Sequence, residues 1–281
     1  MSESRAIGPS HRVRRNRVIA VIVGIVLVSC AMGAGALSGA HGADGGGSGA
    51  AAPDPTTTAT PTPTRPAPAV ESAPTAVPTF DRHARSIDDP ASIWVVSNKQ
   101  RPLSPIDYVP SDLVDVPVPH TWDPVLRAEA AAAIVGMFQA ASTEAGLTLA
   151  SNSAYRSFSS QTRVYENDVA SNGQAAADMS TARPGHSEHQ TGLAMDIGAA
   201  SGDCSLDACF AGTPEGQWLA ANAYRFGFLL RYPADKVAVT GFEFEPWHYR
   251  YIGIDLATEM HDTGVTTLEE FFGLPAAPGY A

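Results

Sequence analysis

The chain has 281 residues, with 18 basic and 29 acidic side chains and a formal net charge of −11, a length that suits one or two domains. Five of the arginines lie in residues 1–17, so the rest of the chain is more acidic still. This balance argues against a nucleic-acid partner, whose phosphates need lysine and arginine, and against adsorption of the globular part to anionic lipid.

An uncharged apolar segment follows the arginine cluster. Residues 18–37 contain no charged side chain, and about 20 such residues cross the hydrocarbon core of a bilayer. Because the arginines precede this segment, the positive-inside rule places the rest of the chain outside the cytoplasm. We expect residues 1–40 to export the protein and to hold it in the cell membrane as a single-pass signal anchor. Two alternatives stay open: a cleaved secretory signal, and a lipoprotein signal ending at Cys30.

Residues 41–86 are composed almost wholly of glycine, alanine, proline and threonine. Such a segment has too few large apolar side chains to offset the entropy lost on folding. We therefore expect a linker without secondary structure, extended where it is rich in proline, that could carry a domain on the order of 100 Å from a membrane.

Residues 87–281 alternate helix-like and strand-like stretches, which is typical of one domain of mixed α and β structure. Asp123 and Pro124 resemble the start of a helix, and Gly146 its end. The patterns predict helices over 126–145, 159–172, 214–225, 254–261 and 268–272, and strands over 147–153, 193–197 and 242–245.

Two cysteines, Cys204 and Cys209, lie close enough in sequence to close a small loop. In an exported protein a disulfide is the leading interpretation. A zinc-binding pair is the alternative, but no second pair of cysteines lies nearby.

The stretch SEHQTGLAMD, residues 187–196, contains one histidine and one aspartate in a mostly small and apolar run. If residues 193–197 form a strand, Asp196 lies on the face opposite Met195 and Ile197. Gly192 allows the backbone to turn between His189 and Asp196. Both polar residues are then free to line a cleft, although ordinary polar residues near a turn would look the same.

A second polar stretch, EPWH, runs from Glu245 to His248. The proline between these two residues disfavours a regular helix or a central strand. Two histidines and one carboxylate, with a fourth position left for water, form a known catalytic zinc set. A further carboxylate that does not bind the metal can take the proton of that water. The pattern favours His189, Asp196 and His248 as ligands and Glu245 as the base.

These residues resemble a known family. The pattern S-x-H-x-x-G-x-A-x-D in residues 187–196 and the pattern E-x-W-H in residues 245–248 are similar to those of VanY-type D-alanyl-D-alanine carboxypeptidases. The stretches WVVSNKQRPLSPIDYVP and SAYRSFSSQ are also similar to parts of these proteins. The resemblance implies a single α+β domain of the Hedgehog and DD-peptidase type, with a small antiparallel sheet flanked by helices.

The resemblance also implies roles for individual residues. His189, Asp196 and His248 would bind Zn²⁺, Glu245 would be the general base, and Arg156 would stabilise the oxyanion. Gln161 and Ser187 would contact the substrate, a peptidoglycan stem peptide ending in D-alanine. Taken alone, these last three have plainer interpretations: an ion pair, a helix surface and a turn.

The resemblance leaves several functions open. The leading hypothesis is a zinc carboxypeptidase that removes the terminal D-alanine, and we expect it to be a monomer. An L,D-carboxypeptidase, a D,D-dipeptidase or an endopeptidase acting on cell-wall peptides is the alternative. A wall-binding zinc module without hydrolysis is disfavoured, because it would not need Glu245.

Overall fold

The computed structural model describes residues 80–281. The predicted anchor, residues 1–40, and most of the predicted linker lie outside the described residues. Within the described part, no helix is both long enough and apolar enough to span a bilayer. The predicted linker extends to residue 86, but Phe80 stacks on Trp94 with 5.6 Å between ring centroids, and Arg82 donates to the carbonyl of Phe271. The packed region therefore begins earlier than expected.

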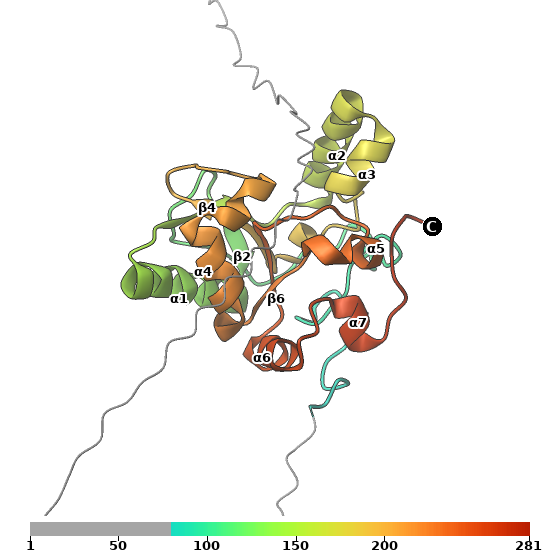
Figure 1. Ribbon diagram of the computed structural model, residues 1–281. Helices are drawn as coiled ribbons and strands as arrows, with labels where there is room; N and C mark the ends of the chain where they lie inside the picture. Colours follow the sequence, from blue (N-terminus) through green and yellow to red (C-terminus); the bar gives the residue numbers. More distant parts are fainter. Residues whose placement is uncertain (1–79) are drawn as a thin grey trace, which may run out of the picture. The chain divides into compact units, whose positions relative to one another are not determined.

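The domain combines two small sheets with several helices (Figure 1). The helices are α1 Ala128–Ala145, α2 Phe158–Asn172, α3 Gln174–Ser180, α4 Pro214–Asn222, α5 Val237–Thr240, α6 Ile254–Thr263 and α7 Leu268–Phe272. The strands are β1 Leu113–Asp115, β2 Val125–Arg127, β3 Leu149–Ser153, β4 Ala194–Ala199, β5 Phe228–Leu230 and β6 His248–Tyr251. This arrangement confirms the expected α+β class.

The larger sheet has the order β3-β4-β6-β5, and every neighbouring pair is antiparallel. Met195 on β4 lies opposite Tyr249 on β6, while Asp196 lies opposite His248. Because side chains alternate along a strand, the first pair lies on one face of the sheet and the second on the other. α4 packs against β4, α6 against β5 and α1 against β3.

Helix α1 contributes a buried stripe to the core, formed by Ala130, Ala131, Ile134, Met137, Phe138 and Ala141. The spacing of these residues is that of one helix face. The helix ends where Gly146 adopts a left-handed conformation with φ of 67°, as the sequence predicts. Its predicted start at Asp123 and Pro124 is wrong, because the chain first forms β2, which pairs with β1, and the helix begins after Arg127.

Most other predicted elements are confirmed, but strands β1, β2, β5 and β6 and helix α5 have no counterpart among the predictions. The predicted strand over 242–245 is a loop, and the strand that pairs in the sheet is β6. Helix α3 was not predicted; it follows α2 after Gly173 and packs beside it (Figure 1).

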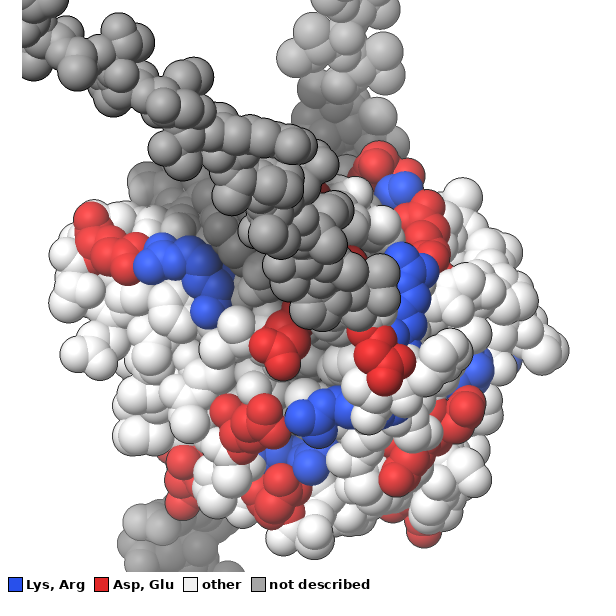
Figure 2. All heavy atoms as spheres, turned by 90° about the horizontal axis from the view of Figure 1, so that it is seen from below, with Lys and Arg blue, Asp and Glu red and all other residues white. Residues whose placement is uncertain are grey.

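The surface mixes charges of both signs. On the face shown in Figure 2, basic and acidic side chains lie close to one another among the described atoms. Several form exposed ion pairs, including Arg225 with Glu144 at 2.7 Å and Lys236 with Glu270 at 2.8 Å. Exposed pairs of this kind add little to the free energy of unfolding.

Candidate metal centre

Two predicted ligands come from neighbouring strands at the centre of the larger sheet. Asp196 on β4 is the cross-strand partner of His248 on β6. The Nδ1 atom of His248 lies 3.2 Å from Oδ1 of Asp196, and both residues are buried. The strand pairing therefore brings together side chains that are 52 residues apart in sequence.

The third predicted ligand lies on the short 3₁₀ helix η1, Glu188–Thr191. The Nε2 atom of His189 is 3.3 Å from Oδ2 of Asp196. Gly192 ends the 3₁₀ helix with φ of 66°, and a Cβ atom there would lie 2.9 Å from Leu113. Glycine is therefore required both for the turn and for space, and the turn leads directly from His189 into β4.

The donor set fits zinc. One ligand atom from each of His189, Asp196 and His248 lies within 4.8 Å of the others. Nε2 of His189 lies 3.3 Å from Oδ2 of Asp196, and Nδ1 of His248 lies 3.2 Å from Oδ1, so each histidine faces one oxygen of the shared carboxylate. Two imidazole nitrogens and a carboxylate oxygen are ligands that zinc prefers.

Each imidazole is oriented by its other ring nitrogen. Nδ1–H of His189 donates to the carbonyl of Ala154 at 2.6 Å, which leaves Nε2 facing Asp196. Nε2–H of His248 donates to Glu188 at 3.2 Å, which leaves Nδ1 facing Asp196. Such partners fix the tautomer and the ring orientation of metal-binding histidines.

The charges at the site favour a bound cation. Burial disfavours a charged His248, but its hydrogen bonds to Asp196 and Glu188 outweigh burial and raise the pKa of His248 to about 9. Burial likewise opposes ionisation of Asp196, yet His189 and His248 hold the pKa of this carboxyl well below its usual range. A carboxylate surrounded by imidazoles attracts positive charge, which a metal ion supplies.

Glu245 lies beside the three candidate ligands. Its Oε2 atom is 3.8 Å from Nδ1 of His248, and its backbone is fixed by hydrogen bonds to Tyr232 and His248. Burial, together with the negative charge of Asp196, raises the pKa of Glu245 to about 8. A neighbouring cation lowers the pKa of a carboxyl, so Glu245 is placed to exchange a proton at neutral pH.

The other predicted site residues lie around this centre. Arg156 donates its backbone N–H to the carbonyl of His189 at 3.2 Å, and its Nε atom is buried without a hydrogen-bond partner among the described residues. Gln161 is buried; its amide nitrogen donates to Ala182 at 2.7 Å, and its side-chain oxygen has no partner there. Ser187 is buried directly before η1.

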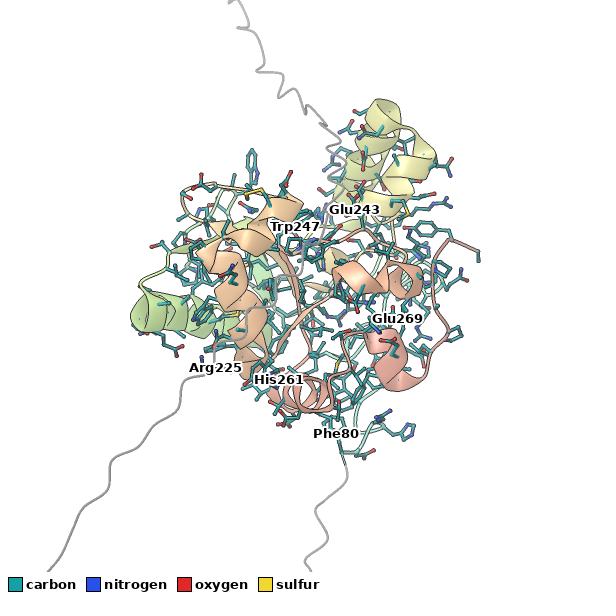
Figure 3. The ribbon with its side chains drawn as sticks, viewed as in Figure 1. Phe80, Arg225, Glu243, Trp247, His261 and Glu269 are labelled. Carbon is teal, nitrogen blue, oxygen red and sulfur yellow. A yellow bond between two sulfur atoms is a disulfide. The ribbon has the colours of Figure 1, made fainter. Side chains whose placement is uncertain are left out.

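Other residues near the two motifs lie outside the cluster. Nδ1 of His186 is 2.8 Å from the carbonyl of Asn98. Cys204 and Cys209 form the expected disulfide. Glu243 is exposed and Trp247 is half-buried on the segment that leads into β6 (Figure 3).

Sequence reasoning missed four residues near the centre. Glu188, Arg231 and Arg250 form buried ion pairs behind His248, and the ring of Tyr232 lies 4.8 Å from that of His248. No local pattern identifies them, because their partners lie on distant segments. The exception is Glu188, whose charge inside an apolar stretch next to a candidate ligand is itself a signal.

The model of the family described as "VanY: D-alanyl-D-alanine carboxypeptidase" matches residues 123–254. A putative carboxypeptidase of Bacillus subtilis (strain 168), YodJ, is 43% identical over 192 residues, which cover 66% of this chain and 69% of the relative. The bifunctional D-Ala-D-Ala dipeptidase and carboxypeptidase VanXYC of Enterococcus gallinarum is 33% identical over 180 residues, covering 62% of this chain and 90% of the relative.

Solved structures give the same result. The LdcB LD-carboxypeptidase superposes with a TM-score of 0.61 at 43% identity, covering 66% of this chain and 87% of LdcB. A variant of the D,D-pentapeptidase VanY from a VanB-type resistance cassette, in complex with Zn(II), gives 0.53 at 34% identity, covering 64% and 98%. VanYB in complex with D-alanine-D-alanine gives 0.52 at 33%, covering 65% and 97%.

The two motifs, the antiparallel sheet that joins them, the donor set and these similarities agree with one another. The chain therefore belongs to the VanY-type D-alanyl-D-alanine carboxypeptidases, a family of zinc peptidases.

Proposed function

We propose that the protein is a zinc carboxypeptidase that hydrolyses the terminal D-alanine of peptidoglycan stem peptides. The observation that carries this proposal is the cluster of His189, Asp196 and His248 with Glu245 beside it. The complex of the related VanYB with D-alanine-D-alanine supports the substrate class.

The residues of the site divide the chemistry between them. Zinc, which His189, Asp196 and His248 would hold, would supply Lewis acidity that lowers the pKa of a bound water molecule toward about 7. Glu245 accepts a proton from the attacking water and returns it to the departing amine of D-alanine. The guanidinium of Arg156 stabilises the negative charge that develops on the scissile carbonyl oxygen. The Nε–H of Arg156, which has no hydrogen-bond partner in the described part of the chain, supports this role.

Two further side chains have hydrogen-bonding capacity for a substrate. The side-chain oxygen of Gln161 is buried without a partner among the described residues, while its nitrogen is fixed by Ala182. Because its nitrogen is already bonded, the Gln161 amide can use its oxygen to accept a hydrogen bond from a polar group of the peptide. Ser187 lies between His186 and η1, where its hydroxyl can serve the same purpose.

A second candidate is cleavage of an L,D bond in a shorter stem. It is supported by the similarity to LdcB, an LD-carboxypeptidase, at 43% identity. Both activities use the same metal and base, so they differ only in how the pocket accepts the residue before the terminal D-alanine.

We further propose that residues 1–40 anchor a monomeric enzyme in the cell membrane with its catalytic domain outside the cytoplasm. The uncharged segment after the arginines and the Cys204–Cys209 disulfide support export. Membrane fractionation separates an anchored or lipidated chain from a secreted one, and mass spectrometry of the mature N-terminus separates the first two. Light scattering of the purified chain tests the monomer.

The function is tested by incubating the full chain with tripeptide, tetrapeptide and pentapeptide stems and by following released products with mass spectrometry. Release of alanine from the pentapeptide supports the D,D activity, and release from the tetrapeptide alone supports the L,D activity. Release of alanine from free D-alanyl-D-alanine, assayed beside the stem peptides, supports a D,D-dipeptidase. The Glu245→Gln variant is the control: it should keep zinc and lose hydrolysis. A wild-type chain that binds zinc and cleaves no stem peptide would contradict the proposal.

A further inference from the structure

A fully buried carboxylate lies behind the metal centre. Glu188 precedes His189 in the chain, but its side chain points to the other histidine: Nε2–H of His248 donates to its Oε2 atom at 3.2 Å. Its Oε1 atom accepts hydrogen bonds from Arg231 and Arg250, each at 2.8 Å. The exposed fraction of the Glu188 side chain is 0%, and the carboxylate is held by hydrogen bonds from these three residues.

The cluster continues to the C-terminal helix. Arg231 donates two hydrogen bonds to Glu269 on α7, at 2.7 Å and 2.9 Å, and Glu269 also accepts from Asn98 at 2.9 Å. The side chains of Arg231 and Glu269 are also 0% exposed. Figure 3 labels Glu269 on α7. Two carboxylates thus face two guanidiniums, and the buried charges balance.

The geometry limits what Glu188 can do. It is separated from Asp196 by the ring of His248, so it contacts the imidazole at the nitrogen that faces away from Asp196. By contrast, His189 uses a backbone carbonyl for the equivalent contact. A carboxylate is a stronger acceptor than a carbonyl, and it makes the imidazole a better electron donor to a metal.

We propose that Glu188 is a positioning residue that keeps the proton of His248 on Nε2, so that Nδ1 faces the metal, and that Arg231 and Glu269 hold Glu188 in place. This inference rests on the zinc-dependent function proposed above. It assigns a role in metal binding to α7, an element that carries none of the ligands. Burying four charged side chains costs free energy of folding unless each is paired with an opposite charge. In this cluster the ion pairs extend to His248, one of the candidate metal ligands.

The test compares three variants of the full chain with the wild type. Glu188→Gln removes the negative charge, and Glu188→Asp keeps the charge for the arginines but shortens its reach to His248. Glu270→Gln is the matched control, because Glu270 follows Glu269 in α7 but is exposed and paired with Lys236. Circular dichroism establishes which variants are folded. If Glu188→Gln does not fold, the comparison of Glu188→Asp with the wild type decides the test.

Two measurements are independent of hydrolysis. Competition with a chelator gives zinc affinity, which we expect to fall about 10- to 100-fold in the Glu188 variants and to stay within about twofold of the wild type in Glu270→Gln. NMR of the zinc-loaded chain reports the hydrogen bond made by Nε2–H of His248: its proton signal should lie far downfield and exchange slowly in the wild type and in Glu270→Gln, and should move upfield and exchange faster in the Glu188 variants.

Unchanged zinc affinity and an unchanged His248 signal in a folded Glu188→Asp chain would overturn the inference. Because neither measurement uses a peptide, failure of the proposed function would be seen separately, as intact stem peptides in the presence of a normally loaded wild-type chain.

Discussion

Zinc binding is expected to release about two protons near pH 7, and this prediction follows from two raised pKa values. In the metal-free protein the pKa of His248 is about 9 and that of Glu245 is about 8, so at pH 7 both groups carry a proton. His248 must lose its proton to expose Nδ1 to the metal. Glu245 loses its proton because a cation beside a carboxyl lowers its pKa.

The other two ligands add no protons. Burial, assisted by the positive charge of Arg156, lowers the pKa of His189, and the pKa of Asp196 lies well below its usual range. Because two protons compete with the metal below pH 8, the apparent affinity for zinc should rise about 100-fold per pH unit there, which is about 2.7 kcal/mol. The rise should become shallower above pH 8 and should end above about pH 9.

Calorimetry in buffers that differ in ionisation enthalpy measures the number of protons directly. The wild-type chain should release about two at pH 7 and Glu245→Gln about one, because glutamine carries no titrating proton. Equal release from the two proteins would show that Glu245 does not respond to the metal. Release of less than one proton from the wild type would contradict the raised pKa of His248.

Three further predictions concern the fold and the reaction. Gly192→Ala should lower the free energy of unfolding by more than Gly146→Ala does. Both glycines have a positive φ, which costs alanine about 1–2 kcal/mol, but of the two positions only residue 192 would bring a Cβ atom within 2.9 Å of a side chain. Equal losses of the two variants in urea titrations would contradict this prediction. Replacing Cys204 and Cys209 by alanine should cost about 2 kcal/mol, because the disulfide closes a short loop; an unchanged melting temperature would contradict it. Arg156→Ala should lower kcat about 10²- to 10³-fold at unchanged zinc content, and a normal kcat would exclude the oxyanion role.

The cluster of His189, Asp196 and His248 could be predicted because its residues lie in two short motifs. His189, Gly192 and Asp196 are close in sequence, so their types and spacing already indicate a turn that leads into a strand. The same holds for Glu245 and His248. Helix ends were predictable for a similar reason, since glycines after helices adopt left-handed conformations that other residues avoid.

The elements that sequence reasoning missed depend on distant partners. The alternation from Phe242 to Glu245 imitates a strand with two faces. However, Phe242 packs on Tyr232 at 4.8 Å between ring centroids, and none of the strands in residues 80–281 pairs with this segment. Strand β6 includes Arg250, and a charged side chain disfavours a strand at the centre of a sheet. The structure shows that Glu188 neutralises this charge. Because Glu188 and Arg250 are 62 residues apart, no short sequence motif reveals that they form an ion pair.

One zinc ion shared by three side chains is central to the proposed reaction. Diffraction from crystals of the zinc-loaded chain, collected on both sides of the zinc absorption edge, locates the metal without reference to any reaction. We predict a single strong anomalous peak bonded to Nε2 of His189, a carboxylate oxygen of Asp196 and Nδ1 of His248. A peak elsewhere, or one that either histidine does not touch, would contradict the account.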